Sequence, residues 1–495
     1  MGLSRRAAIV ASGRVATTGS ILVVNALLAR AWAPDLFGQF STIWVLGNTL
    51  VPFFLMGIPG ALLYTLPRRE SPQRGALLVR STVVLAASAL VLCLVLWIAS
   101  PLIALSVDGL TAAQLGDSLL SFLPYVFCLV AGGHIEAALV ASGRPMWQAV
   151  IAWLGAVVLI GSASGAYVFN WSVELTFAAL SAAGLARLLI AYVALGRVAR
   201  ARGPNVGMSD FLRYAITIGA SEGVGSLSRS VDRLVVLLFL DPSRMGIYHL
   251  GAIEVPVSLV LASLVTVMVP EVSRLMAAGD IDQVADLFRT AVVRLSWLIL
   301  PLFFYLFVFT DDVMRLYLPP AYGDSANVFR CFLLILPLRC AIYNPILVGS
   351  GRANWALFGS LADLVVNTML SVGLVLWLRE AHPSLAMLGP AVATVSATYL
   401  QVLVLLLAIS HLLSRSVRHL LPWAHLLRVS AFAAATATGA YWVLSALIHG
   451  AGTRLLLGSV IMVCGAWGMP ALLFREDRRE ITALLRAVVR PERGS

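Results

Sequence analysis

The stretch Leu139-Val140-Ala141-Ser142-Gly143-Arg144 returns later in the chain as Leu347-Val348-Gly349-Ser350-Gly351-Arg352, at an offset of 208 residues. A tryptophan follows both copies at the same distance, as Trp147 and Trp355. Recurrence of a motif at one fixed offset is typical of a chain built by internal duplication. The sequence therefore predicts two structurally similar halves.

A second loop recurs at the same offset of 208 residues. Pro34 and Gly38 align with Pro242 and Gly246 when 208 residues are added to their numbers. Two unrelated loops that share one offset are poorly explained by chance. The duplication should therefore extend over most of each half.

The composition places these halves in a membrane. Hydrophobic residues make up 60% of the 495 residues, charged residues 12%, and the mean hydropathy is +0.91. A helix needs about 20 apolar residues to cross the roughly 30 Å hydrocarbon core. Runs of that length recur along the chain without the period-two alternation of a membrane β-barrel. The predicted fold is an all-α, polytopic membrane protein.

Fourteen spans are expected. They fall at about residues 12–31, 39–65, 76–99, 119–142, 148–169, 174–198, 211–239, 245–272, 286–309, 327–349, 355–378, 387–411, 425–448 and 455–474. The offset accommodates six spans, an even number, so the second half starts on the same side of the membrane as the first. This predicts two parallel six-helix lobes related by a pseudo-two-fold axis along the membrane normal.

The expected domains follow from that division. Residues 1–205 form an N-terminal six-helix lobe and residues 206–411 a C-terminal six-helix lobe. Residues 412–495 add two transmembrane helices and a basic amphipathic cytoplasmic tail without counterpart in the first half. The polar segment 199–205 suits a cytoplasmic connection between the lobes.

The distribution of arginine predicts the orientation. All 35 basic residues are arginine. With the N-terminus inside, nineteen of them fall in cytoplasmic segments and five outside, so both termini are expected in the cytoplasm. The net charge of +11 is spread over short loops, which favours membrane orientation over nucleic-acid binding.

The seventh span is the richest in charge. It contains Glu222, Arg229, Asp232 and Arg233, of which positions 222, 229 and 233 lie within about 40° on a helical wheel. A charged side chain within a span costs about 2.5–3.5 kcal/mol on insertion scales, so each needs a partner or a water-filled cavity. Internal pairing that only orients the helix is one explanation. An aqueous cavity is the other.

The repeat gives this polar face a counterpart on the first span. Subtracting 208 takes Glu222 to Arg14 and Arg233 to Asn25. The first and seventh spans are therefore expected to face each other across a cavity. Further charged residues lie inside other spans: Glu136, Arg187, Glu254, Arg339 and Asp363.

Prolines interrupt the second and eighth spans. Pro52 and Pro59 fall in the second, and Pro256 and Pro270 in the eighth. Bent helices are expected there, because proline removes a backbone donor and clashes with the preceding turn. Such breaks expose backbone and can let a bundle alternate between inward-open and outward-open states.

Motifs of soluble chemistry are missing from the sequence. Without lysine there is no P-loop, and the seven histidines show no metal-ligand spacing. Gly-x-Ser-x-Gly is not present as a nucleophile elbow, because its match at residues 219–223 lies inside the predicted seventh span and not at a strand-to-helix turn. The sequence therefore predicts a non-enzyme with no catalytic residue, metal or cofactor. The five cysteines all fall inside predicted spans and give no disulfide framework.

Several segments resemble a known family. They are Leu28-Ala29-Arg30 with Pro34 and Phe37-Gly38-Gln39-Phe40; Asp232-Arg233-Leu234-Val235-Val236 with Gly246-Ile247-Tyr248; Val269-Pro270-Glu271-Val272-Ser273-Arg274-Leu275; and Tyr322-Gly323-Asp324-Ser325-Ala326. The pattern is similar to that of the oligosaccharide flippases, the polysaccharide transporter branch of the MOP exporter superfamily. It covers nearly the whole chain, although its motifs are loose and mostly structural.

The resemblance implies a fourteen-helix exporter of the bacterial inner membrane. It would move an undecaprenyl-diphosphate-linked oligosaccharide from the cytoplasmic to the periplasmic leaflet for surface polysaccharide such as O-antigen or exopolysaccharide. Alternating access, coupled to H⁺ or Na⁺, and a cationic cavity are implied as well. Glycosyltransferases and a polysaccharide polymerase are the implied partners.

The family pattern does not fix individual site residues, so the intramembrane charges supply the candidates. Arginine suits diphosphate because its planar fork can bind two oxygens at once. The candidates for diphosphate or sugar contact are Arg14, Asn25, Arg229, Arg233 and Arg339. Those for ion coupling or charge balance are Glu222, Asp232, Glu254 and Asp363.

Three other functions remain open. A multidrug exporter of the same superfamily would favour acidic cavity residues with few arginines, which the seventh span does not match. A peptidoglycan-precursor flippase would favour arginine on spans one, two and eight, whereas span two has none inside and span eight carries Glu254. A glycolipid polymerase or ligase would need large periplasmic loops, and the longest expected here have only about 15–20 residues.

Overall fold

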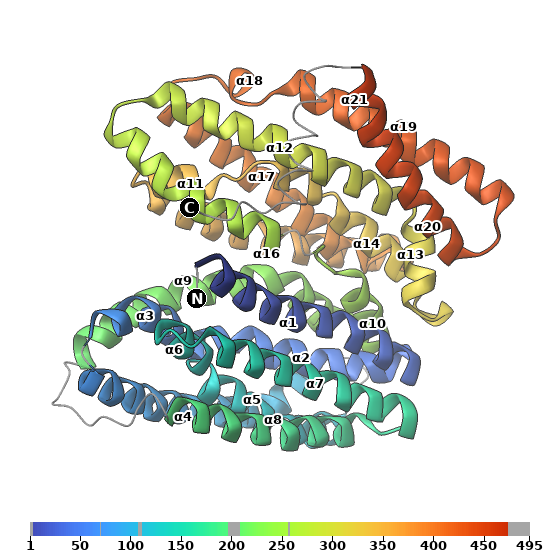
Figure 1. The fold of residues 1–495 in the computed structure, drawn as a ribbon. Coiled ribbons are helices and arrows are strands. Elements are labelled where there is room, and N and C mark those ends of the chain that lie inside the picture. The colour runs from blue at the N-terminus through green and yellow to red at the C-terminus, as the bar shows by residue number, and fades with distance from the viewer. Residues whose placement is uncertain (1–2, 70, 107–110, 197–207, 256–257, 474–495) are drawn as a thin grey trace. The chain divides into compact units, whose positions relative to one another are not determined.

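The computed structural model describes residues 3–69, 71–106, 111–196, 208–255 and 258–473, and every regular element in those ranges is helical (Figure 1). The chain divides into two compact units, Met1–Leu250 and Gly251–Ser495. The predicted linker at 199–205 and the tail beyond residue 473 lie outside the described residues.

Eleven helical elements build the first unit, and the last of them ends one residue beyond the division. They are α1 (Leu3–Ala31), α2 (Pro34–Phe54), α3 (Ile58–Thr65), the short 3₁₀ turn η1 (Leu66–Arg68), α4 (Ser71–Ser106), α5 (Ala112–Gly132), α6 (Ile135–Ala141), α7 (Pro145–Phe169), α8 (Val173–Gly196), α9 (Met208–Phe239) and α10 (Pro242–Gly251). Within this unit α1 packs along α7, α5 along α4 and α8, and α9 along α2 and α3.

The second unit contains the remaining elements that the structure describes. They are α11 (Ser258–Ala277), α12 (Ile281–Val308), α13 (Thr310–Tyr317), η2 (Pro320–Tyr322), α14 (Ser325–Leu333), η3 (Leu336–Cys340), α15 (Asn344–Gly349), α16 (Ala353–Ala381), η4 (Pro383–Leu385), α17 (Leu388–Leu412), α18 (Val417–Leu420), α19 (Trp423–Leu447), α20 (Ala451–Met462), the π-helical turn η5 (Val463–Gly468) and α21 (Met469–Leu473). Here α16 packs along α17 and α19 along α12.

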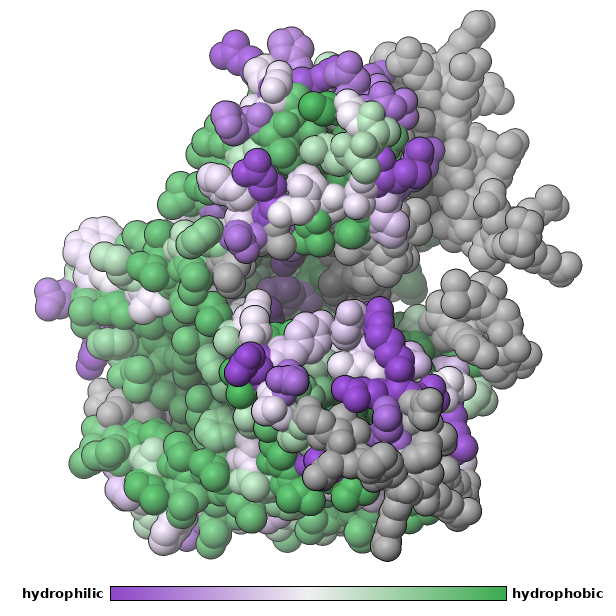
Figure 2. Space-filling model, turned by 90° about the vertical axis from the view of Figure 1, so that its left-hand side faces the viewer, coloured by the Kyte–Doolittle hydropathy of each residue, from purple (hydrophilic) through white to green (hydrophobic). Residues whose placement is uncertain are grey.

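Each of the fourteen predicted spans coincides with one helix or with a run of consecutive helical segments, which confirms the predicted fold class. Among the described residues, eleven helices are long and apolar enough to cross a membrane by themselves. The seventh, eighth and tenth spans are outside that group, because α9 carries charge and the other two are interrupted. Figure 2 shows broad hydrophobic areas on the surface, as expected for helices that face lipid, with the hydrophilic residues gathered in patches.

The second and eighth spans are interrupted, as predicted. Between α2 and α3 the backbone turns through Met56 and Gly57, whose φ angles of 53° and 66° are left-handed. Ser88 Oγ donates a hydrogen bond of 2.7 Å to the carbonyl oxygen of Phe54, one of the groups that the break leaves without a helical partner. In the eighth span, residues 252–255 are without regular structure between α10 and α11. Pro270, by contrast, lies inside α11 without ending it.

The repeated loops have the same backbone. Gly143 and Gly351 adopt left-handed φ angles of 74° and 75°, and the Arg144 and Arg352 amides each donate 2.8 Å hydrogen bonds five residues back. The glycine amides themselves bond three residues back, at 3.0 Å in both copies. This is the glycine-terminated helix end known as the Schellman motif. At this loop the sequence repeat is therefore also a structural repeat.

The second pair of repeated positions meets in space. Pro34 and Pro242 each stand at the start of a helix. A methyl group on Gly246 would lie 2.6 Å from the Pro34 carbonyl oxygen, and one on Gly38 would overlap the Pro242 carbonyl oxygen. Each glycine thus packs against the proline of the other copy. A two-fold operation produces such a reciprocal contact.

The compact units do not divide where the repeat predicts a boundary. The repeat places it at 205/206, whereas the units divide after Leu250. The difference arises because α9 packs along α2 and α3, and because the start of α10 contacts the start of α2. The first helix of the second repeat therefore belongs by packing to the first unit.

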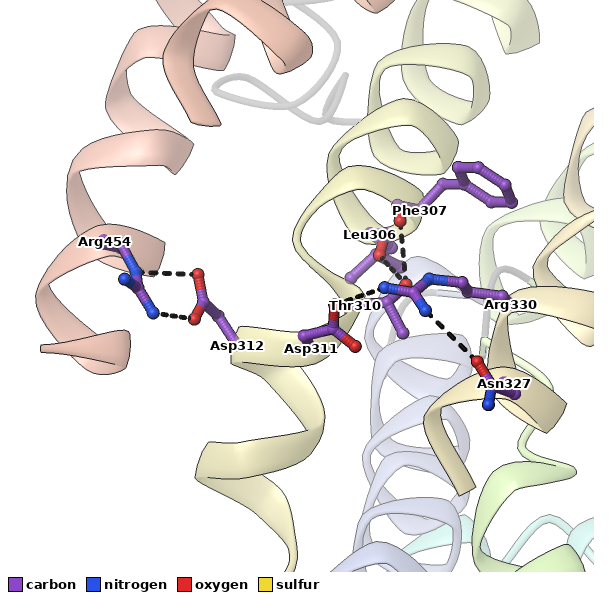
Figure 3. Close-up of polar contacts among 8 residues, drawn as sticks. All are labelled: Leu306, Phe307, Thr310, Asp311, Asp312, Asn327, Arg330 and Arg454. Atoms are coloured by element: carbon purple, nitrogen blue, oxygen red, sulfur yellow. Dashed lines mark hydrogen bonds and ion pairs between the residues drawn. The ribbon is translucent and has the colours of Figure 1, made fainter. Parts of the chain in front are cut away.

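Two neighbouring aspartates on α13 form ion pairs with two different helices of the second unit, one of them the C-terminal helix α20 (Figure 3). Asp312 on α13 is 1% exposed and forms a bidentate ion pair with Arg454 of α20. Asp311, one residue earlier, pairs with Arg330 of α14 at 2.5 Å. One short helix thus joins the tenth and fourteenth spans to the end of α12.

Candidate functional site

The charged seventh span is a single helix of 32 residues, α9, that packs on α2 and α3 through small residues. A methyl group on Gly219 would lie 2.9 Å from the Cα of Met56, and one on Gly223 would lie 2.6 Å from the ring of Phe53. The two backbones therefore approach closely at the break in the second span. This contact fixes the rotation of α9 about its own axis relative to α2 and α3.

The charges lie beside this packed face, because Glu222, Arg229 and Arg233 are about 60–100° from the midpoint of Gly219 and Gly223 on the helical wheel. Glu222 and Arg229 are exposed, and Arg233 is half-buried with its Nη1 donating to the Arg229 carbonyl oxygen at 3.2 Å. Gly225 leaves room for the guanidinium of Arg229, because a methyl group there would lie 3.3 Å from Nη1. Two guanidinium groups and one carboxylate thus share a helix face, as the helical wheel predicts. We call Glu222, Arg229 and Arg233 the α9 stripe.

Asp232 does not belong to the α9 stripe. Its carboxylate is buried, with the residue 2% exposed, and it accepts a 2.8 Å hydrogen bond from the Tyr248 hydroxyl of α10. A buried carboxylate is stabilised by donors that compensate the water it has lost. The sequence motif contains Tyr248 without assigning it a role, and the turn between α9 and α10 brings its hydroxyl to Asp232.

The first-span candidates lie on a helix that packs elsewhere. Arg14 is exposed and makes no hydrogen bond or ion pair with a described residue, whereas Asn25 is 6% exposed. Their helix, α1, packs along α7, and α9 packs along α2 and α3. Arg14 therefore presents a guanidinium without an acidic partner among the described residues.

In the second unit, Arg339 and Glu254 come together. Arg339 Nη2 in η3 lies 3.6 Å from Glu254 Oε2, which belongs to the unwound segment 252–255. The two side chains are 48% and 55% exposed, and they line a small cavity of about 30 Å³. An exposed pair of this kind contributes little stability, about 0–1 kcal/mol, so either partner can exchange for a ligand at small cost.

Asp363 occupies a different setting. It lines a groove of about 240 Å³ between α16 and α17, whose other lining residues include Trp355 and Phe358. One turn further along α16, Asn367 is 1% exposed and its side-chain oxygen accepts hydrogen bonds from two hydroxyls, Ser371 at 3.0 Å and Thr394 at 3.2 Å. The two acidic candidates of the second unit are therefore separate, Glu254 in the unwound segment and Asp363 in this groove.

Comparison with known proteins identifies the family of this chain. The family model described as "Polysaccharide biosynthesis protein" matches residues 3–276, more than half of the chain. The chain belongs to this polysaccharide biosynthesis family. No functionally curated protein matches its sequence.

Solved structures with the same fold come from transporters of a wider group. A structure of the lipid II flippase MurJ in an inward closed conformation has a TM-score of 0.72 at 13% identity, with 94% of this chain and 99% of that chain covered. A MOP superfamily transporter from Pyrococcus furiosus has a TM-score of 0.59 at 14% identity, covering 83% of this chain and 95% of that one. An inward-facing multidrug resistance MATE family transporter of the MOP superfamily gives 0.59 and 14%, covering 80% and 94%.

These likenesses concern the fold. They confirm that this member of the polysaccharide biosynthesis family is a multi-pass membrane protein with the architecture of MOP superfamily flippases and transporters. The breaks in the second and eighth spans and the α9 stripe are features of this chain's own residues.

Proposed function

We propose that the protein is a flippase that translocates an undecaprenyl-diphosphate-linked oligosaccharide from the cytoplasmic to the periplasmic leaflet of a bacterial inner membrane. The product would serve surface polysaccharide synthesis, such as O-antigen or exopolysaccharide. Membership of the polysaccharide biosynthesis family and a fold shared with flippases support this proposal. Both termini would lie in the cytoplasm, as the arginine count predicts.

The α9 stripe carries the proposal. Arg229 is an exposed cation near the middle of a helix that is expected to span the membrane. Such a charge costs about 2.5–3.5 kcal/mol at a helix centre unless it meets water or an anion. A diphosphate supplies several acceptor oxygens, and hydrogen bonds from arginine to phosphate are among the stronger ones. Arg229 and Arg233 would therefore contact the diphosphate, with Arg14, Asn25 and Arg339 as further contacts along the path.

The acidic candidates would balance these cations and couple transport to H⁺ or Na⁺. Glu222 shares the stripe with the two arginines, and Glu254 already pairs with Arg339 at 3.6 Å. When a carboxylate beside a substrate-binding arginine takes up a proton or a cation, it no longer pairs with the arginine, and the arginine becomes free to bind the substrate. Asp232 and Asp363 would serve in the same way from their buried and groove positions. Glycosyltransferases and a polymerase would act before and after the flippase.

The decisive experiment measures where the glycolipid accumulates. Cells that lack this protein are complemented with wild type, with the double variant Arg229→Ala and Arg233→Ala, or with Arg213→Ala. Undecaprenyl-linked oligosaccharide is quantified by mass spectrometry, and its leaflet is assigned with a membrane-impermeant sugar oxidant. Arg213 is a matched control, because it is exposed on the same helix but about 160° from Arg229 on the wheel.

The expected result is glycolipid trapped on the cytoplasmic leaflet in the deletion strain and in the double variant, with near-normal export by Arg213→Ala. Loss of one to four charge-assisted hydrogen bonds, at about 1.5–3 kcal/mol each, predicts at least a tenfold loss of export. Normal surface glycan and normal leaflet distribution in the deletion strain would refute the proposed substrate. Normal export by the double variant would refute only the role of the α9 stripe.

A further inference from the structure

A second polar cluster lies in the first unit, away from the α9 stripe. Arg187 on α8 donates from Nη2 to Glu136 Oε1 at 2.9 Å and from Nε to the carbonyl oxygen of Ile151 on α7 at 3.1 Å. Gln148 Nε2, also on α7, donates to the other carboxylate oxygen of Glu136 at 3.1 Å. Both oxygens of this carboxylate on α6 are thus held from two neighbouring helices. The sequence marks Glu136 and Arg187 as separate intramembrane charges and does not reveal that they pair.

The helix that carries Glu136 has a joint at each end. α6 contains only seven residues, Ile135–Ala141, and begins after a turn at Gly133 and His134 that separates it from α5. At its other end, Gly143 adopts the left-handed φ of 74° that closes the Schellman motif. Gly133 and His134 keep right-handed helical φ and ψ angles, so the first joint is an interruption between two helices in line, whereas the second joint at Gly143 leaves the helical conformation. A short helix between two such joints can move as a rigid piece, because the φ and ψ changes are confined to the joints.

α6 packs against α3, which also follows a break. A methyl group on Gly133 would overlap the side chain of Leu55, so the two joints touch each other. On its other side α3 meets α9, where a methyl group on Gly60 would lie 3.2 Å from Ile218 and 3.5 Å from the carboxylate of Glu222. A shift of α6 therefore displaces α3, and a shift of α3 changes the surroundings of the α9 stripe.

There is space beside α6 into which it can move. A cavity of about 200 Å³ lies among α5, α6, α7 and α8, and Glu136 and Arg187 are both part of its wall. Their side chains are 38% and 26% exposed. The ion pair and the Gln148 hydrogen bond are thus polar contacts that hold α6 at the edge of an incompletely filled space.

The second repeat builds the same elements without this cluster. An offset of 208 residues takes Glu136 to Asn344 (136 + 208), Gln148 to Ala356 (148 + 208) and Arg187 to Val395 (187 + 208). The counterpart of α6 is α15, which begins at Asn344 and ends in the same Schellman motif. The fold as such therefore does not require the charges.

We propose that Glu136 and Arg187 are positioning residues whose ion pair latches α6 in the state described here, and that release of the pair lets α6 and α3 move together during transport. This latch rests on the proposed function for its role in a cycle. The claim that one ion pair holds a hinged segment in place does not depend on the proposed function. The pair acts on the α9 stripe through α3 and does not itself contact substrate.

The test is hydrogen exchange on the full-length protein in lipid nanodiscs without substrate. Glu136→Gln, Arg187→Met and the charge-reversed double variant Glu136→Arg with Arg187→Glu are compared with wild type. Arg244→Met is the control, because it breaks a half-exposed ion pair of the same unit, with Asp241 at 3.2 Å, that is not connected to α6.

Each single variant should speed the exchange of the α6 amides about fivefold to tenfold, the effect of losing a contact worth about 1 kcal/mol. Exchange in α5 and α7 and the thermal unfolding temperature should stay unchanged, and charge reversal should restore slow exchange. In the export assay, the single variants should change the rate of transport without changing equilibrium binding of undecaprenyl diphosphate.

Other outcomes would overturn the latch. Faster exchange throughout the first unit with a lower unfolding temperature would make the pair merely structural, and unchanged α6 exchange would show that it does not hold the helix. A charge-reversed variant that behaves like the single variants would exclude the ion pair as the cause. Since exchange is measured without substrate, these results are independent of whether the protein flips glycolipid.

Discussion

The break between α2 and α3 makes a quantitative prediction about Gly57. This residue has a left-handed φ of 66°, and a methyl group on it would overlap the backbone of Ala215 and Gly219 on α9. A residue with a side chain loses about 1–2 kcal/mol in the left-handed region. Forcing an extra methyl group into a closed contact costs about 1–3 kcal/mol. Gly57→Ala should therefore lose about 2–5 kcal/mol of unfolding free energy.

Three other glycines separate the two contributions. Gly143 has a φ of 74° with open space around it, so Gly143→Ala tests the backbone strain alone, at about 1–2 kcal/mol. Gly219 has an ordinary helical backbone, but a methyl group on it would overlap the backbone of Met56 and lie 2.5 Å from the Gly57 nitrogen, against 3.4 Å or more for an ordinary contact, so Gly219→Ala tests the overlap alone. Gly161 in α7 has neither problem, and Gly161→Ala should leave stability unchanged or slightly raised.

The assay is thermal unfolding of the purified full-length variants in detergent micelles, followed by tryptophan fluorescence. The unfolding temperature should fall in the order Gly161→Ala, then Gly143→Ala and Gly219→Ala, then Gly57→Ala. The loss for Gly57→Ala should approach the sum of the two middle variants. The reasoning fails if Gly57→Ala is as stable as Gly161→Ala, since the break would then tolerate a side chain and α9 would not lie against it.

Two further predictions concern buried carboxylates. Asp312 is 1% exposed, so Asp312→Asn leaves the guanidinium of Arg454 without its buried anionic partner. The packing of α20 should weaken, at a cost of about 3–5 kcal/mol of unfolding free energy. Faster proteolysis or hydrogen exchange confined to α19 and α20 would support this prediction, and unchanged exchange there would contradict it. Tyr248→Phe removes the 2.8 Å hydrogen bond to Asp232 while keeping the side-chain volume nearly constant. The unfolding free energy should fall by about 1–3 kcal/mol in the same thermal assay. A variant as stable as wild type would mean that other groups fully compensate the Asp232 carboxylate.

The parts of the structure that the sequence predicts are those fixed by local chemistry. Span positions follow from runs of apolar residues, because each helix must satisfy its own backbone in lipid. The repeated Ser-Gly-Arg loops follow from glycine, whose left-handed backbone closes both helix ends in the same way. The face of α9 that holds Glu222, Arg229 and Arg233 follows from helical periodicity alone.

The parts that the sequence does not predict depend on contacts between distant segments. Glu136 and Arg187 are 51 residues apart, and nothing in their spacing indicates that two helices bring them within 2.9 Å. Asp232 is adjacent to Arg233 in sequence, yet the turn into α10 encloses it against Tyr248. The unit boundary moves to residue 250 for the same reason, because glycines on α9 allow it to approach α2 more closely than hydropathy can show.

The reciprocal contact of Pro34 and Gly38 with Pro242 and Gly246 has a bearing on how such a chain arises. Before duplication, a single six-helix ancestor would carry one proline and one glycine in this loop, and two copies could meet through the same patch on each. Fusion of the two copies into one chain turns that homodimer interface into an internal one. From then on, each side of the contact can change independently of the other, as Phe40 and Tyr248 at equivalent positions already do.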